Sequence, residues 1–157
     1  MSSYQWALLF HLIGVFAFVS GALVLETAAV RARREGRSGE IATLLGVSRI
    51  GEHAANAGGV VLFAFAFWLV HLTPYGFGDA WIVAALTLFV LQGLPVNLVV
   101  KRRKRAKALA DELAAGGSPV SPELRRLLDD RATIRLAYVA HLITVAIIVL
   151  MVWKPGA

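Results

Sequence analysis

Four long apolar stretches constrain the fold of this chain more than any other feature of its sequence. They cover about residues 6–30, 51–73, 80–100 and 134–153. Each has the roughly 20 residues that an α-helix needs to cross the hydrocarbon core of a bilayer. With 58% hydrophobic residues and a mean hydropathy of +0.69, the composition is typical of a membrane bundle. We expect a single integral membrane domain over residues 1–157, all-α, folded as an up-down-up-down bundle of four transmembrane helices.

The basic residues predict the orientation of these helices. Of the 16 Lys and Arg residues, 15 lie within residues 31–50 or between positions 101 and 135. The positive-inside rule makes 31–50 and 101–133 cytoplasmic loops, which puts the N and C termini and the 73–79 turn outside. The tryptophans form an aromatic belt towards that same outer side: Trp6, Trp68, Trp81 and Trp153. We expect a multi-pass protein of the cell (inner) membrane.

Helical patterns continue beyond the apolar stretches into both loops. Apolar residues at helical spacing over 41–48 predict that the second helix begins inside the first loop. Good helix formers continue the third helix to about residue 115, and the N-cap signal Ser121-Pro122 starts a new one. The fold therefore includes helical cytoplasmic extensions. Pro95 removes one backbone hydrogen bond within the third span and predicts a kink near Gly93.

Composition excludes several kinds of site. The chain has no cysteine, so disulfides, thiolate metal sites and cysteine nucleophiles are excluded. Its basic residues border the spans and are not interleaved with aromatic residues, so we expect no nucleic-acid partner. The first stretch runs about 24 residues without a basic segment before it, which predicts a mature span and not a signal peptide. No nucleophile elbow or phosphate loop is present, and no catalytic residue is assigned.

Polar residues recur at one depth in the four spans. At about 1.5 Å per residue, Glu26, His53, Asn97 and His141 lie roughly 6–9 Å inside the cytoplasmic boundary. Asn56 extends the polar edge beside His53. Ionisable residues in hydrocarbon are costly and are functional candidates by default. We expect Glu26, His53 and His141 to be mutual partners.

The histidines suggest b-type haem, or a related porphyrin, as a cofactor. Two imidazoles on facing helices can supply axial ligands, and small residues make room for the macrocycle. His53 with His141 is the inner candidate pair, although these spans are diagonal, and His11 with His71 is the outer pair. The candidate partners of propionates or anionic lipid are Arg49, Arg131, Arg135, Lys101, Arg102 and Arg103. The alternative is that the histidines form interhelical hydrogen bonds of about 1 kcal/mol or less each. The identity of any other metal stays open.

Several segments resemble an uncharacterised prokaryotic family of small four-helix integral membrane proteins (DUF2269-like). They are the opening LLFHLIGVFAFVSGALVLE, the basic first loop and the closing VAIIVLMVWKPG. That family is distantly similar to the CopD copper-resistance domain and to HemJ, the membrane protoporphyrinogen oxidase, by the pattern of His11, Gly14 and Gly21. The HemJ likeness implies a bound porphyrin. Residues 23–34 lack the Pro-Arg and His-containing continuation of HemJ, so the oxidase activity is not implied.

Three functions stay open. The first is a non-catalytic accessory or scaffold membrane protein that acts through its packing surfaces and basic hairpin. The second is a haem- or porphyrin-binding redox or carrier protein that uses the intramembrane histidines. The third is a small oligomeric ion, proton or metal permeation protein, with Glu26 as its intramembrane acid. Expected partners are the lipid bilayer, anionic lipid, and a second copy of the chain or another membrane protein.

Overall fold

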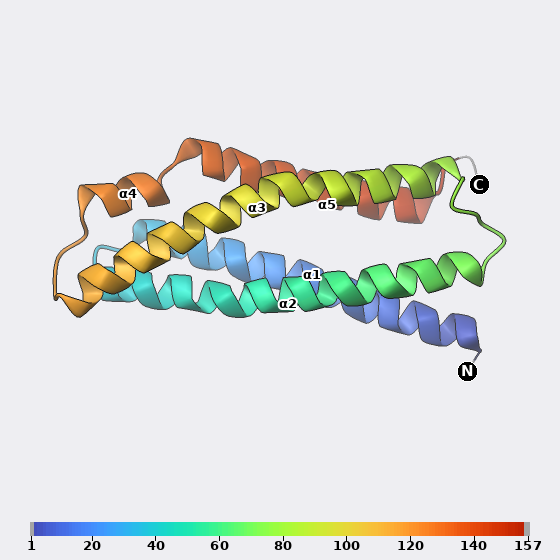
Figure 1. Ribbon diagram of the computed structural model, residues 1–157, viewed down its shortest axis with the longest axis horizontal. Helices are drawn as coiled ribbons and strands as arrows, with labels where there is room; N and C mark the ends of the chain where they lie inside the picture. The colour runs from blue at the N-terminus through green and yellow to red at the C-terminus, as the bar shows by residue number, and fades with distance from the viewer. Residues whose placement is uncertain (1, 156–157) are drawn as a thin grey trace.

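The computed structural model describes residues 2–155 and confirms an all-α fold (Figure 1). The helices are α1 (Ser3–Arg34), α2 (Ser38–His71), α3 (Ala80–Ala115), the short α4 (Pro122–Leu128) and α5 (Arg131–Trp153). α1, α2, α3 and the α4–α5 segment each contain an apolar window long enough to cross a membrane. The four long helices alternate in direction along the chain, as expected for an up-and-down bundle.

The two ends of the bundle differ in character. At the basic end lie the α1–α2 connection, residues 35–37, and the segment 116–130 that includes α4. At the turn end lie the start of α1, the 72–79 connection and the end of α5. The helical extensions expected at the basic end are present. The second helix begins inside the first connection, as predicted, and of residues 31–50 only 35–37 are not helical.

Side chains at the helix starts explain where these elements begin. Ser2 and Gln5 form a capping box at α1, and the Ser121 hydroxyl accepts from the backbone N–H of Leu124 at α4. Asp130 accepts from the first backbone N–H groups of α5. Pro95 lies inside α3 without ending it. Figure 1 shows α3 changing direction near its middle, in agreement with the expected kink.

α1 and α2 form the most extensive helix pair, because glycines let their backbones meet. A Cβ atom added to Gly14 would lie 2.4 Å from the backbone nitrogen of Leu62, and one added to Gly58 would lie 2.4 Å from that of Phe18. Buried small residues recur every seven positions along α1: Ala7, Gly14, Gly21 and Ala28. A strict period of seven keeps one face against the partner helix over its whole length.

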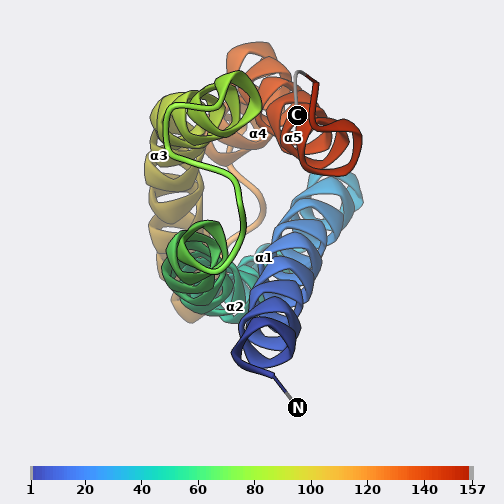
Figure 2. The same ribbon diagram turned by 90° about the vertical axis from the view of Figure 1, so that its right-hand side faces the viewer.

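The remaining helices pack less evenly. Around the bundle axis the order is α1, α2, α3, α5 (Figure 2). α3 packs against both α2 and α5, whereas among the described residues no Cα atom of α1 lies within 8 Å of one in α5. The bundle is therefore a tight α1–α2 hairpin joined to an α3–α5 pair, with one side less closed than the others.

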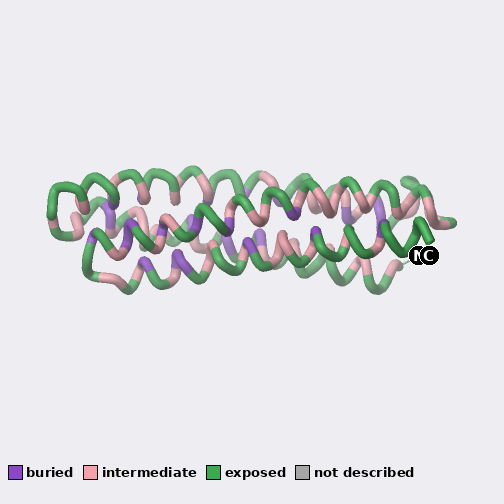
Figure 3. The backbone as a smooth tube through the Cα atoms, turned by 90° about the horizontal axis from the view of Figure 1, so that it is seen from below, coloured by how far each residue is buried: buried purple, intermediate pink, exposed green. Residues whose placement is uncertain are grey.

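The best-packed part of the chain lies at the basic end. Within the described residues, the largest side chains that are fully buried are Ile41 and Leu124, both 0% exposed. They belong to a core cluster, here called the basic-end core, that consists of Ala32, Ile41, Ala42, Leu45, Ala106, Ala110 and Leu124. Figure 3 shows buried positions to be more frequent in this half of the molecule. Apolar residues at this end face water in the unfolded chain, so the hydrophobic effect drives their burial.

Two polar contacts hold the connections over the basic-end core. The guanidinium of Arg125 donates to the backbone carbonyls of Arg33 at 2.7 Å and Glu35 at 2.5 Å. These carbonyls end α1 and otherwise lack helical partners. The Ser38 hydroxyl donates to the carbonyl of Ser118 at 2.7 Å, which ties the start of α2 to the loop before α4.

Candidate functional site

The half-buried acid Glu26 takes part in an ion-pair cluster between α1 and α3. Its carboxylate accepts from Arg103 at 2.5 Å and lies 3.5 Å from Arg33. All three side chains are at most 25% exposed. Arg103, predicted as a propionate or lipid ligand, is therefore already neutralised inside the protein. The carboxylate expected to partner histidines instead joins two helices and compensates a cation.

The other members of the predicted inner layer do not converge. His53 and Asn56 lie on an exposed face of α2. Asn97 is exposed, and its amide donates to the carbonyl of Gly93 in the same helix at 2.8 Å. His141 is half-buried, and its Nδ1 donates to the carbonyl of Ala137 one turn earlier at 2.6 Å. No Cα atom of α5 lies within 8 Å of α2 in the described chain, so His53 and His141 are not brought together.

His141 shares a groove with Glu26 on the α1–α5 side. The groove has a volume of about 520 Å³, and its lining residues on α1 also include Thr27, Arg31 and Arg34. One part of the predicted layer is thus retained, an acid and a histidine facing the same space. Within the described residues, no group of three or more His, Asp or Glu side chains is arranged to hold a metal ion.

The remaining basic candidates lie on the surface or in structural contacts. Arg49, Lys101, Arg131 and Arg135 are exposed. Arg102 pairs with Asp130, the N-cap of α5, and donates to Thr133. The hydrogen bond from the Thr133 hydroxyl, 2.5 Å long, lowers the pKa of Asp130 against the opposing effect of burial. The charge of Arg102 lowers this pKa further. Arg102 therefore supports a helix start.

At the turn end, His11 binds the neighbouring helix. Its Nδ1 donates to the backbone carbonyl of Leu62 in α2 at 2.9 Å, beside the close approach of Gly14 to Leu62. This bond selects one tautomer, so that Nε2 of the neutral ring is the acceptor. His71, its predicted partner, is exposed and does not line the cavity that His11 lines. The outer pair of histidines is therefore not assembled either.

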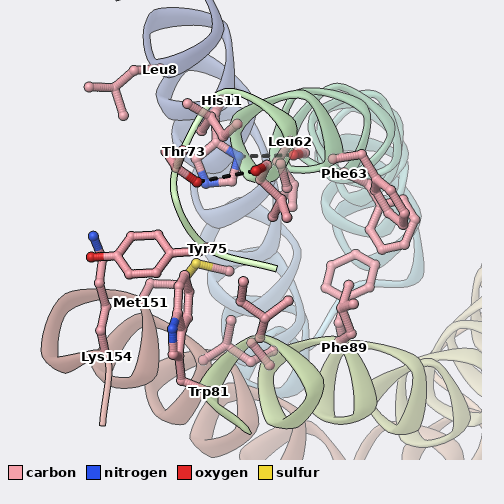
Figure 4. A pocket seen from close by; sticks show the side chains of 18 of the residues that line it. Leu8, His11, Leu62, Phe63, Thr73, Tyr75, Trp81, Phe89, Met151 and Lys154 are labelled. Carbon is pink, nitrogen blue, oxygen red and sulfur yellow. Dashed lines mark hydrogen bonds between the residues drawn. The ribbon is translucent and has the colours of Figure 1, made fainter. Parts of the chain in front are cut away.

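A cavity lies beside His11. Two adjoining cavities, of about 310 and 190 Å³, are here called together the turn-end chamber. Residues that line both are His11, Leu12, Leu62, Phe89, Ile147, Met151 and Val152. Figure 4 shows His11 and Leu62 at one side of the larger cavity, the rings of Phe63 and Phe89 at another, and Tyr75, Trp81 and Lys154 grouped at a third. Its walls come from α1, α2, α3, α5 and the 72–79 turn.

The polar side of the chamber is an aromatic and cationic cluster. The rings of Tyr75 and Trp81 meet edge to face with centroids 5.4 Å apart. The ammonium group of Lys154 lies 5.0 Å from the centre of the Tyr75 ring and 5.8 Å from that of Trp81. Both distances are within the range of cation–π attraction. Two regions distant in sequence, residues 75–81 and the end of α5, thus place a cation at the edge of an apolar cavity.

A buried glutamine connects α3 and α5 at the inner side of the chamber. The amide of Gln92, 5% exposed, donates to the carbonyl of Ala140 at 3.1 Å and to the hydroxyl of Thr144 at 2.6 Å. In lipid there is no hydrophobic driving force for helices to associate, so interhelical hydrogen bonds such as these orient the helices. The two cavities and these contacts define the candidate site.

Comparison with known proteins adds one decisive match. Residues 6–155 match the profile of the family DUF2269, described as "Predicted integral membrane protein". The chain belongs to the DUF2269 family. No curated protein and no solved structure matches this DUF2269 protein. The predicted family resemblance, the multi-pass membrane location and the four transmembrane helices are thereby confirmed.

Sequence reasoning missed three residues of the chamber in this DUF2269 protein. Gln92 is the single amide in the apolar run 80–94 and could have been noticed by the same criterion as Glu26. By sequence, Trp81 belongs to the aromatic belt, and Lys154 is the one Lys or Arg outside the two basic regions. No sequence signal joins Trp81 and Lys154, because their proximity depends on how α5 ends beside the 72–79 turn.

Proposed function

We propose that this DUF2269 protein is a non-catalytic accessory or scaffold protein of the inner membrane, with its basic end in the cytoplasm and both termini outside. The observation that carries the proposal is the basic-end core, a close-packed platform built from parts of four helices. Exposed cations surround it: Arg31, Arg34, Arg105, Arg126 and Arg131. A surface held rigid by its own core loses little conformational entropy when a partner binds.

The proposed orientation makes a prediction that the cysteine-free chain can test cleanly. Gly39→Cys and Gly78→Cys each add a thiol at an exposed glycine whose added Cβ would meet no atom within 4 Å. In intact cells, an impermeant maleimide is expected to label Cys at position 78 and to leave position 39 unlabelled until the membrane is permeabilised. The reverse pattern would refute the orientation, and labelling of both would show a mixed topology.

The scaffold role itself is tested by photocrosslinking in cells. A photoreactive residue in place of Arg105 is expected to give one discrete adduct, with a second copy of the chain or with one other protein. Reciprocal tagging of the identified protein should recover the same adduct. Reversing a neighbouring charge, Arg126→Glu, should remove most of it, because the partner surface must complement these cations. A photoreactive residue at Gly78 serves as the control.

The scaffold proposal is contradicted if position 105 crosslinks only lipid or gives the same products as position 78.

The scaffold proposal and the haem alternative also predict different absorption spectra of the purified protein. The two expected histidine pairs are not brought together, so a haem would have one histidine ligand, either His11 in the chamber or His141 in the α1–α5 groove. The scaffold proposal predicts no Soret band, oxidised or reduced. A band that disappears in His11→Ala would favour a haem protein.

A further inference from the structure

The turn-end chamber has the composition of a binding site for an amphiphile. Its larger cavity, about 310 Å³, falls within the usual range for ligand pockets, roughly 300–1,000 Å³. Its walls are mostly aliphatic and phenyl side chains, with polar groups at Tyr75, Trp81 and Lys154 on one side and at His11 and Thr73 on another. An apolar body with a few convergent polar groups is the common form of such sites.

One buried polar atom in the chamber wall lacks a partner. Trp81 is 7% exposed, and its indole Nε1 is the one buried side-chain nitrogen or oxygen in residues 2–155 that makes no hydrogen bond. Buried tryptophan N–H groups normally find an acceptor. The indole can only donate, and this one is enclosed by protein atoms, so it remains an unmatched donor in the wall of the chamber.

Lys154 supplies a positive charge beside that donor. It ends α5 in the left-handed region, with φ 44° and ψ 60°, and its backbone N–H still bonds the carbonyl of Leu150 at 2.9 Å. No carboxylate within residues 2–155 lies within 4 Å of its ammonium group. The one acid of the adjacent turn, Asp79, accepts from the backbone N–H of Gly76 at 3.0 Å. An anion is therefore the charge complement of this end of the chamber.

The chamber can be reached from the bilayer. It is lined by Leu12 of α1 and by Ile148 and Val152 of α5, which are 45%, 42% and 80% exposed. These helices do not approach within 8 Å at their Cα atoms. In a membrane, the space between them faces lipid chains, so a hydrocarbon chain can enter sideways while its head stays at the interface.

We infer that the turn-end chamber binds a single-chain amphiphile with an anionic head, a carboxylate or a phosphate. The hydrocarbon chain lies among the aliphatic and phenyl side chains. The head lies by the Lys154 ammonium and beside the Trp81 ring, whose centre is 5.8 Å from that ammonium.

Quenching of Trp81 fluorescence tests this inference directly. Replacing Trp6, Trp68 and Trp153 by Phe leaves Trp81 as the only tryptophan; the three replaced rings are 44%, 43% and 80% exposed. Dibrominated stearate, added to the detergent-purified protein, is expected to quench Trp81 saturably. Its methyl ester, which has the same chain and no charge, should bind about tenfold more weakly, the usual scale of one charge-assisted hydrogen bond.

Three variants separate the head and chain contacts. Lys154→Gln should weaken stearate binding to the level of the ester and leave ester binding unchanged. Ala66→Phe, at a residue that lines the larger cavity, should abolish saturable quenching by filling the chamber. Ala64→Phe, on the exposed face of the same helix, is the matched control and should bind normally.

Further ligand comparisons identify the head group of the amphiphile and can refute the inference. Dibrominated lysophosphatidate that binds more tightly than stearate would assign a phosphate head, and the opposite order a carboxylate. Equal quenching by acid and ester in both the parent and Lys154→Gln would show simple partitioning and refute the site. Quenching that persists unchanged in Ala66→Phe would also refute the site. Quenching that occurs only when a bound haem is displaced would refute it as well.

Discussion

Gly58→Ala is expected to loosen the α1–α2 hairpin, although alanine is the better helix former. The added methyl group would lie 2.4 Å from the backbone nitrogen of Phe18 and 2.7 Å from the backbone oxygen of Gly14. Backbone atoms cannot move aside as flexible side chains do, so the helices must separate along their shared face. Overpacking of this kind costs about 1–3 kcal/mol, and Gly58→Leu should cost more. Unfolding in a denaturing detergent, followed by circular dichroism, measures the loss.

Gly93→Ala is the matched control for this substitution. Gly93 also lies inside a long helix, but a Cβ atom there would meet no atom within 4 Å. Gly93→Ala should therefore gain stability from the higher helix propensity of alanine, up to about 1 kcal/mol, without any clash. The two variants are thus expected to shift stability in opposite directions. Equal shifts would mean that close backbone contact does not hold α1 to α2.

Leu124→Ala should have the second largest effect, through the basic-end core. Leu124 is 0% exposed and is the one residue that α4 contributes to this cluster. Truncating a buried leucine typically costs about 2–5 kcal/mol, from lost burial and from the cavity left behind. Because this end lies outside the apolar stretches, water is the competing solvent. Hydrogen–deuterium exchange should show faster exchange in α4 and in the start of α2, with the turn end unchanged.

Leu94→Ala provides the comparison within the membrane. Leu94 is 67% exposed on α3, in the apolar part of that helix, so its side chain contacts lipid and no cavity forms when it is shortened. Its loss should change stability little, because lipid chains are as apolar as leucine. If Leu124→Ala were as mild as Leu94→Ala, the basic-end core would not stabilise the platform on which the scaffold proposal rests.

These predictions reflect two kinds of packing in one molecule. At the basic end, burial from water joins parts of four helices around Ile41 and Leu124. In the apolar half, association depends on close contact at Gly14, Gly21 and Gly58 and on polar bonds such as that of Gln92. The chamber lies where neither kind of packing joins α1 to α5.

The membrane location, the number of spans and the helical extensions could be predicted from the sequence alone. Each follows from properties that add up residue by residue along one segment: transfer of apolar side chains into lipid, helix propensity, and capping residues such as Ser121. The small residues at Gly14 and Gly21 also pointed correctly to close packing of α1. No neighbouring helix has to be known for any of these conclusions.

Which polar groups contact one another could be learned only from the tertiary structure. Equal depth suggested that Glu26 would meet His53, but depth gives no information about the rotation of each helix or about which helices are neighbours. The glycine contacts set the rotation of α2 that leaves His53 on an exposed face, while Glu26 pairs with Arg103 from α3. Likewise, Trp81 and Lys154 meet because the end of α5 lies beside the 72–79 turn. Pairing between helices depends on their relative position, which no single segment encodes.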